Sequence, residues 1–290
     1  MYENKRLGFL FVLPFVLGIL LFKLFPFVAS FALSFTQYDL IDPPEWVGLQ
    51  NYRELFGDDP LFRKSLGVTL WFAVLAVPLR VGFALFIAHV LNFKLRGINF
   101  FRSAFYLPSI LGGSIATAVL WRFLFAKYGL VNLLLMKLGF EPIAWLADEH
   151  WSMWTIVFLF TWQFGSAMVI FLAALQNVPQ SLYEAAEIDG AGSWQRFKNV
   201  TMVYLRPAML PYAIYGFVIT FNLFALAYFM SAGGPQGRTE LLVTQAYRLV
   251  NDQRLYGVGA SFAVIMFFIL LGITLVTNRM AKATRSYHDL

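Results

Sequence analysis

Two segments of the sequence place an amide side chain beside aromatic rings. Asn222 lies between Phe221 and Phe224, and Gln163 directly follows Trp162. Aromatic faces and amides bind the rings and hydroxyls of sugars, so both segments are candidates for lining a solute path. An amide in an apolar helix also forms hydrogen bonds between helices, and aromatic residues mostly pack. Structural roles therefore compete with binding at each position.

Arg80 is a third candidate, because it follows Pro78 near the middle of an apolar segment. A charged side chain in a membrane span costs about 3 kcal/mol, so it usually faces a cavity, a partner or the interface. We expect Arg80 to face the interior of a complex, in a lined cavity or at a subunit contact, with a snorkelled position as the alternative. Lys23 and Arg122 lie nearer to the ends of their segments, where snorkelling explains both.

The sequence offers few residues for metal binding, catalysis or ATP hydrolysis. The chain has no cysteine, and its three histidines lack the spacing of metal ligands. An intramembrane lipid-modifying enzyme needs a clustered acid, base or nucleophile, whereas the apolar segments hold almost no carboxylates and His89 stands alone. The sequence also lacks the phosphate-binding loop of ATPases. We therefore expect neither catalysis nor a cofactor in this chain.

The composition places these residues in a membrane protein. Apolar residues make up 59% of the 290 residues and charged residues 13%, against roughly 25% charged in an ordinary soluble domain. The net charge of +6 comes from Lys and Arg at the ends of apolar runs, without the basic stripe of a nucleic-acid-binding protein. We expect one all-α membrane domain over residues 1–290.

Six apolar segments reach the roughly 20 residues that a helix needs to cross a bilayer. The first is too long for a signal peptide and lacks a small-residue cleavage site, so we expect it to be retained. The expected spans are residues 7–35, 66–91, 103–126, 151–175, 206–231 and 256–279.

The charges of the connecting loops orient these spans. The two ends of the chain and the loops at 92–102 and 176–206 carry eleven Lys and Arg residues close to span ends, against eight in the opposite loops. By the positive-inside rule, both termini are expected in the cytoplasm. The outer loop at about 36–65, with Asp42-Pro43-Pro44 and then aromatic residues among charges, predicts a turn and an amphipathic helix at the interface.

The loop between the fourth and fifth spans is too polar to cross the membrane. Pro179 favours a helix start, Ser181 can cap the helix, and Gly190 and Gly192 end it. A second amphipathic stretch then leads to Arg206-Pro207, which predicts a helix-turn-helix on the cytoplasmic face. A connecting loop with solvated charges is the alternative.

The same loop resembles the EAA motif of permease subunits in ATP-binding-cassette (ABC) importers, EAA-x3-G-x9-I-x-L-P. Glu184, Ala185, Ala186 and Gly190 match it, while Val203 stands where the motif has proline. Landmarks along nearly the whole chain resemble the carbohydrate branch of that family, which includes maltose and glycerol-3-phosphate permeases. They are Phe25-Pro26, Ser34-Phe35-Thr36, Trp46-Val47-Gly48-Leu49-Gln50-Asn51-Tyr52, Leu107-Pro108, Trp121-Arg122, Leu175-Gln176-Asn177-Val178-Pro179 and Gly233-Gly234-Pro235.

The resemblance implies a type I ABC importer transmembrane domain in a bacterial or archaeal cytoplasmic membrane. It implies three partner chains and a solute-binding protein: a second permease, two ATPases that bind ATP and Mg, and an extracytoplasmic binding protein. It makes the loop a coupling helix that docks on an ATPase. The residues expected there are Tyr183, Glu184, Ala185, Ala186, Asp189, Gly190, Arg196 and Phe197.

The expected solute is a carbohydrate, specifically an oligosaccharide. Phe221-Asn222-Leu223-Phe224 resembles the Phe-Asn-Asn-Phe segment that lines the sugar site of the maltose permease, with Leu223 as the departure. Glycerol 3-phosphate or an acidic oligosaccharide stays open, because Arg80 could meet an anion. A self-sufficient secondary transporter is disfavoured, since no inverted repeat is detectable.

Overall fold

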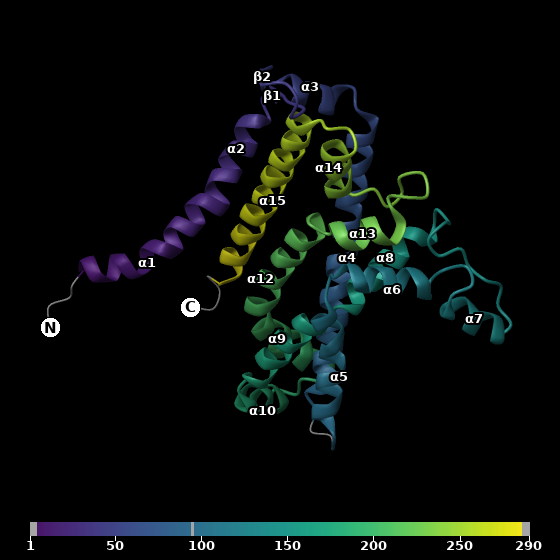
Figure 1. Ribbon diagram of the computed structural model, residues 1–290. Helices are drawn as coiled ribbons and strands as arrows, with labels where there is room; N and C mark the ends of the chain where they lie inside the picture. Colours follow the sequence, from purple (N-terminus) through teal and green to yellow (C-terminus); the bar gives the residue numbers. More distant parts are fainter. Residues whose placement is uncertain (1–4, 94–95, 286–290) are drawn as a thin grey trace. The chain divides into compact units, whose positions relative to one another are not determined.

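The computed structural model describes residues 5–93 and 96–285 (Figure 1). Helices dominate the described part, with one short antiparallel hairpin, in agreement with the expected all-α class. The elements of the first part of the chain are α1 Lys5–Ile19, the π-helix η1 Leu20–Leu24, α2 Phe25–Leu33, β1 Thr36–Gln37, β2 Glu45–Trp46, α3 Gln50–Gly57, α4 Pro60–Leu91, α5 Ile98–Leu111, α6 Ile115–Leu124 and α7 Leu130–Lys137. Those of the rest are α8 Trp151–Trp162, α9 Gly165–Gln176, α10 Gln180–Ile188, α11 Ser193–Arg196, the π-helix η2 Phe197–Thr201, α12 Met202–Phe221, α13 Phe224–Ser231, α14 Leu242–Asn251 and α15 Tyr256–Arg285.

The chain forms two compact units. The first unit contains Met1–Arg63 and Gln245–Phe268, and the second contains Lys64–Thr244 and Ile269–Leu290. The single membrane domain expected over residues 1–290 stays a prediction.

The long apolar helices agree with the expected multi-pass topology. Among the described residues, four helices are long and apolar enough to span a membrane: Leu10–Leu33, Pro60–Leu91, Ser193–Phe221 and Tyr256–Arg279. Two helix pairs, α5 with α6 and α8 with α9, pass the same test together but are bent by 106° and 45°. The count is six, as expected, if each bent pair is one span.

The bend between α5 and α6 corrects the expected straight span at 103–126. Gly112 has φ +59°, a conformation that residues with a Cβ rarely adopt, and it ends α5. Ser114 then caps α6, since its Oγ accepts a hydrogen bond of 3.2 Å from the backbone N–H of Thr117. The Gly-Gly-Ser sequence therefore divides this apolar segment into two helices.

Two other expected spans also differ from the structure. The segment 151–175 consists of α8 and α9, separated at Gln163 and Phe164. The segment 206–231 is interrupted at Asn222 and Leu223, where α12 gives way to α13. Hydropathy reports the length of an apolar segment and is insensitive to single residues at which the helix breaks.

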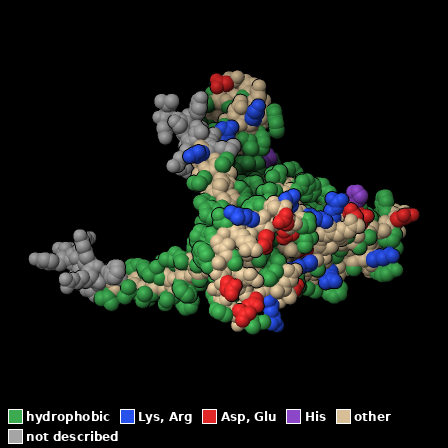
Figure 2. Space-filling view, turned by 90° about the horizontal axis from the view of Figure 1, so that it is seen from above, with side chains coloured by type: hydrophobic (Ala, Val, Ile, Leu, Met, Phe, Trp, Pro, Cys, Tyr) green, Lys and Arg blue, Asp and Glu red, His purple; other side chains and the backbone are tan. Residues whose placement is uncertain are grey.

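The N-terminal helices present their hydrophobic side chains outward. None of the apolar window within Leu10–Leu33 is buried inside the chain, and hydrophobic side chains cover these helices in Figure 2. Phe11 and Phe22 are each 81% exposed. A surface of this kind requires lipid or another apolar chain as its neighbour.

The first unit is organised around Asn51 on α3. Its side-chain amide donates to the carbonyl groups of Ser34 and Thr36, each at 3.0 Å, and Asn51 itself is 5% exposed. The hydroxyl of Tyr52 donates to Ser34 Oγ at 2.6 Å, and the ring of Phe35 stacks on Trp46 with centroids 5.5 Å apart. Two sequence landmarks that lie a dozen residues apart therefore form one packed turn.

The outer segment at 36–65 is only partly as expected. Its amphipathic helix is present as α3, with Leu55 buried and Phe56 exposed. The segment before α3 is a β-hairpin and not a simple turn, and α4 already begins at Pro60, within the expected loop. Pro60 favours this early start, because its fixed φ and missing N–H suit the first helical residue.

The second unit contains two hydrophobic clusters, one nearer to α10 and one farther from it. The α10-side cluster consists mainly of residues from α4, α9 and α12, including Val81, Phe171 and Leu205. The distal cluster consists mainly of residues from α4, α8 and α13, including Phe72 and Phe160. Because α4 contributes to both clusters, it is the common support of this unit.

The replacement Asn51→Leu should destabilise the protein, because it removes two buried hydrogen bonds and leaves the Ser34 carbonyl with only its bond from Ser261 Oγ. A cost of about 2 kcal/mol is expected from the loss of two such bonds. Thermal unfolding of the detergent-solubilised chain measures this loss. Gln50→Leu is the matched control, since Gln50 is exposed and bonds only to its neighbour Glu54. Equal melting temperatures for the two variants would contradict the role given to Asn51.

Candidate functional site

The helix α10 begins where the sequence predicts it, but with a different cap. Pro179 has φ −60° and ψ 130°, an extended conformation, and Gln180 is the first helical residue. Ser181 is therefore already inside the helix, and no side chain caps this end. The expectation that Ser181 caps the helix is wrong, because the extended Pro179 takes the capping position.

Gly190 forms the turn that ends α10. Its φ is +79°. The N–H of Gly190 donates to the carbonyl of Glu187 at 3.0 Å, and the N–H of Ala191 donates to the carbonyl of Ala186 at 2.9 Å. This pair of bonds is a Schellman motif, which requires a left-handed residue at the glycine position. A Cβ at Gly190 would meet no atom within 4 Å, so a substitution there is strained by the backbone conformation alone.

The second helix of the loop continues directly into a span. The stretch Ser193–Phe221 is one continuous helix that contains a π-helical turn at Phe197–Thr201. The second amphipathic stretch leads into the fifth span as expected, and Pro207 lies inside α12. The bend that the motif's proline would introduce is absent at Val203.

Two contacts hold α10 and the second helix together, and two ring contacts pack the second helix. The hydroxyl of Tyr183 lies 2.9 Å from that of Thr201, and Arg196 forms an ion pair of 3.3 Å with Glu187. The ring of Phe197 stacks on Trp194 and contacts His89 of α4, with centroids 5.6 Å and 5.5 Å apart. Tyr183, Arg196 and Phe197 thus stabilise the loop internally.

The other expected docking residues face outward. Glu184, Ala185 and Asp189 are exposed, Ala186 is half-buried, and no ion pair or side-chain hydrogen bond involves Glu184 or Asp189 in the described part. Sequence reasoning missed the apolar residues beside them. Ile188 is 87% exposed, Trp194 73% and Leu182 42%. Their signal is an apolar residue placed among charges in a short polar helix.

The amides proposed for the solute path both lie at helix ends. Asn222 is the C-cap of α12, and its side-chain N–H donates to the carbonyl of Val218 at 2.8 Å. Its side chain is exposed, and its Oδ1 accepts no bond in the described residues. Gln163 is the C-cap of α8 and is 7% exposed, with its Nε2 buried and unpartnered. Asn222 can therefore meet a solute directly, whereas Gln163 cannot in this conformation.

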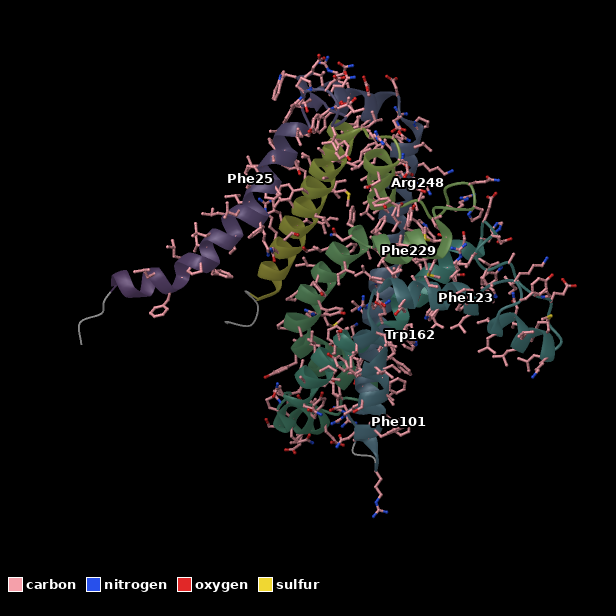
Figure 3. The ribbon with its side chains drawn as sticks, viewed as in Figure 1. Phe25, Phe101, Phe123, Trp162, Phe229 and Arg248 are labelled. Carbon is pink, nitrogen blue, oxygen red and sulfur yellow. The ribbon has the colours of Figure 1, made fainter. Side chains whose placement is uncertain are left out.

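The aromatic candidates divide in the same way. Phe221 is fully buried and cannot present its ring to a solute in this conformation, which corrects the role expected of it. Phe224 is partly exposed and stacks on Tyr228 with ring centroids 5.0 Å apart. Trp162, labelled in Figure 3, is partly buried and packs against Trp121 with centroids 5.5 Å apart. The exposed set next to the break at residue 222 is thus Asn222, Phe224 and Tyr228.

Arg80 lies inside the second unit and is 6% exposed. Its Nη2 donates to the carbonyl of Gln163 at 2.6 Å, and its guanidinium lies 4.7 Å from the ring centroid of Phe160. The side chain therefore serves a helix end, and an open solute path does not reach it in this conformation. Lys23 and Arg122 are exposed, as snorkelled residues would be.

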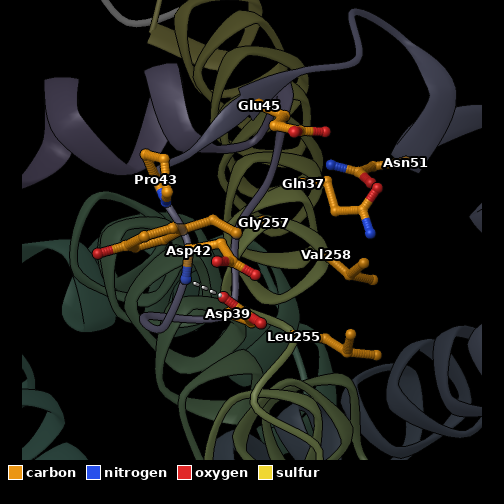
Figure 4. Close-up of a pocket in the computed structure, with 10 residues that line it drawn as sticks. Gln37, Asp39, Asp42, Pro43, Glu45, Asn51, Leu255, Gly257 and Val258 are labelled. Carbon is orange, nitrogen blue, oxygen red and sulfur yellow. Dashed lines mark hydrogen bonds between the residues drawn. The ribbon is translucent and has the colours of Figure 1, made fainter.

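The first unit contains a pocket (Figure 4). It has a volume of about 330 Å³ and includes the carboxylates of Asp39, Asp42 and Glu45. The N–H groups of Asp42 and Ile41 donate to Asp39 and lower the pKa of that carboxyl group. No group of three or more His, Cys, Asp or Glu residues could hold a metal ion in the described part of the chain.

Apolar spans, broken helices and an exposed helix-turn-helix between two spans are the features of a multi-pass membrane protein. Residues 81–285 match the family model described as "Binding-protein-dependent transport system inner membrane component". This match covers more than half of the chain, so the chain belongs to that family. The resemblance inferred from the sequence motifs is confirmed.

Individual relatives agree with this assignment. The "Probable ABC transporter permease protein YesP" of Bacillus subtilis (strain 168) is 41% identical over 277 residues, covering 94% of this chain and 90% of that protein. The "Arabinooligosaccharides transport system permease protein AraP" of the same organism is 33% identical over 289 residues, covering 97% and 90%.

A solved structure confirms the fold. A chain of the bacterial alginate ABC transporter, in complex with its alginate pentasaccharide-bound periplasmic protein, matches with a TM-score of 0.83. The match covers 97% of this chain and 96% of the other, at 19% identity. The expected type I importer fold is therefore confirmed.

The replacement Asn222→Ala should lower solute uptake roughly two- to tenfold, because one exposed amide lost from a binding site removes about 0.5–1.5 kcal/mol. Uptake by the reconstituted transporter over a range of solute concentrations measures the effect. Asn251→Ala is the matched control, since Asn251 is also exposed and donates to the carbonyl four residues earlier at 3.1 Å. Wild-type uptake by the Asn222 variant at every concentration would place the solute elsewhere.

Proposed function

We propose that this chain is the permease subunit of an ABC importer for a carbohydrate, specifically an oligosaccharide, and that it forms half of the translocation path. The observation that carries the proposal is the exposed helix α10, closed by Gly190 at φ +79° and carrying Glu184 unpaired, in a chain of this transport family. The chain is not itself the ATPase in this proposal.

The loop from α10 to η2 suits docking on a separate ATPase. Glu184 offers a carboxylate for a cationic partner residue, and the small side chain of Ala185 permits close approach. Ile188 and Trp194 add apolar area that water otherwise covers. Because Tyr183 and Arg196 join the two helices, a displacement of α10 would be transmitted to α12.

The remaining partners follow from the same function. Two ATPases that bind ATP and Mg would drive transport, and a second permease would complete the path. The unburied helices at Leu10–Leu33 support an apolar contact with that second permease or with lipid. The family description supports an extracytoplasmic solute-binding protein as the further partner.

The proposed location is a bacterial or archaeal cytoplasmic membrane, with both termini in the cytoplasm. The eleven Lys and Arg residues at the N-terminus, at 92–102, at 176–206 and at the C-terminus support this orientation by the positive-inside rule. The same orientation places the docking loop in the cytoplasm, where ATP is available.

A carbohydrate is supported by residues and by a relative. Exposed Asn222 beside the Phe224 and Tyr228 rings offers a hydrogen-bond acceptor next to aromatic faces, which suits a sugar ring and its hydroxyl groups. The AraP relative is named for arabinooligosaccharides. A neutral solute is favoured over an anionic one, because Arg80 is buried and donates to Gln163.

Gly190→Leu should weaken docking, because a side chain at a positive φ costs about 1 kcal/mol or more, a factor of roughly five in the docking equilibrium. Gly192→Leu adds the same side chain two residues later at φ −66°, where no such strain arises. Glu184→Lys reverses the charge on the exposed face and should act like Gly190→Leu. Retained ATPase subunit and solute-stimulated hydrolysis of the purified complex measure docking.

The docking assignment fails if Gly190→Leu and Glu184→Lys both match Gly192→Leu in these two measurements. The substrate assignment has its own experiment: uptake of labelled oligosaccharides into proteoliposomes that contain the complete complex. Uptake driven by ATP and dependent on the binding protein is expected. Solute accumulation by this chain alone, without ATPase, would overturn the proposal in favour of a secondary transporter.

A further inference from the structure

One backbone oxygen joins three helical segments of the second unit. The carbonyl of Gln163, at the end of α8, accepts from Arg80 Nη2 of α4 at 2.6 Å and from Ser109 Oγ of α5 at 3.1 Å. Ser109 Oγ in turn accepts from the N–H of Ser166, in the first turn of α9, at 3.0 Å. The break between α8 and α9 is therefore held from two sides.

The junction lies between the two hydrophobic clusters. Phe160, three residues before Gln163, belongs to the distal cluster, and Phe164, one residue after it, belongs to the α10-side cluster. Along α4, Ala76 belongs to the distal cluster, and Val81 next to Arg80 belongs to the α10-side cluster. Any change in the angle between α8 and α9 would thus change the orientation of the α10-side cluster relative to the distal cluster.

Arg80 also lies close to the hydroxyl groups of Tyr212 and Tyr215 on α12. Among the described residues no carboxylate pairs with it, and its Nε is buried without a partner. The guanidinium instead meets the Gln163 carbonyl at the negative end of the α8 dipole and the ring of Phe160. Moving the Gln163 carbonyl away would leave the buried guanidinium without this acceptor. Arg80 therefore favours the arrangement of the α8 end in which the carbonyl stays within hydrogen-bond distance.

The α5 side of the junction is fixed by close packing. A Cβ at Gly165 would lie 2.7 Å from the carbonyl oxygen of Phe105 and 2.9 Å from Ser109 Oγ. The start of α9 therefore touches α5 directly, and the helix cannot rotate toward α5. Arg80 supplies the matching restraint on the side of α4.

We propose that Arg80 is a positioning residue that fixes the 45° bend between α8 and α9, so that motion of the docking loop passes into the distal half of the subunit. The path is short, because α9 ends at Gln176 and α10 begins at Gln180. The proposal rests on the proposed function, since the motion it transmits begins at the docked ATPase. Arg80 thus has a positioning role and does not contact the solute.

The first experiment measures coupling in the assembled complex. Arg80→Met keeps much of the side-chain volume and removes the charge and all donors. We expect roughly a tenfold smaller ratio of solute-stimulated to basal ATP hydrolysis at equal retained ATPase subunit. Arg80→Lys, which keeps a charged donor, should recover a large part of that ratio. Arg122→Met is the matched control, because Arg122 is exposed within an apolar segment, and it should leave the ratio unchanged.

The second experiment needs neither solute nor ATPase. The chain has no cysteine, so cysteines at exposed Phe158 of α8 and Ile170 of α9, on opposite sides of the bend, can carry the only two spin labels. The distance distribution between them should be narrow in the otherwise unchanged chain and broad or shifted with Arg80→Met. Ser109→Ala, which leaves Arg80 in place, should broaden it less.

Unchanged distances together with an unchanged stimulation ratio in Arg80→Met would overturn the positioning role. If Arg80→Met fails to assemble, Arg80→Lys and Ser109→Ala decide by the same two measurements, and normal values for both would overturn the role. A wild-type complex that takes up no carbohydrate would instead contradict the proposed function, while the distance measurement would still report on the bend.

Discussion

Every backbone N–H or carbonyl group that a broken helix releases inside a membrane needs a partner from the protein, because lipid supplies none. This requirement explains the polar residues of the second unit. Ser114 caps α6 after the bend at Gly112, Asn222 bonds back to Val218 at the end of α12, and Arg80 donates to Gln163. Ser114 and Asn222 lie where an apolar segment changes direction, and Arg80 reaches the break after α8 from the neighbouring helix α4.

The same requirement shows why a functional interpretation of in-span polar residues is difficult. Asn222 and Gln163 are both amides beside aromatic rings, and the sequence supports the same hypothesis for each. The structure gives both a C-cap position but leaves only Asn222 exposed. Sequence can therefore identify the helix ends as polar positions, whereas exposure of one and burial of the other depend on how α8 and α12 pack on their neighbours.

Local features of the fold were predictable and long-range ones were not. The number of apolar segments, the helix α10 and the turn at Gly190 follow from hydropathy and from a glycine placed after an amphipathic helix. The bend of 106° also has a local cause, the sequence Gly112-Gly113-Ser114, although hydropathy alone does not indicate it. The hairpin before α3 depends on Asn51 bonds to carbonyl groups 15 and 17 residues away, which no local pattern indicates.

The docking loop is held by local contacts, whereas the Arg80 junction is held by long-range ones. This difference has a mechanical consequence. The loop is stiffened by contacts between residues close in sequence, such as the ion pair of Glu187 with Arg196. The junction joins residues 83 positions apart and exists only when α4, α5, α8 and α9 are packed together. A force received by a locally rigid loop can therefore move α9 as a body, but it reaches the distal cluster only through a contact that tertiary packing maintains. Stiffness at the loop and restraint at the junction are separate requirements, and a subunit that transmits motion needs both.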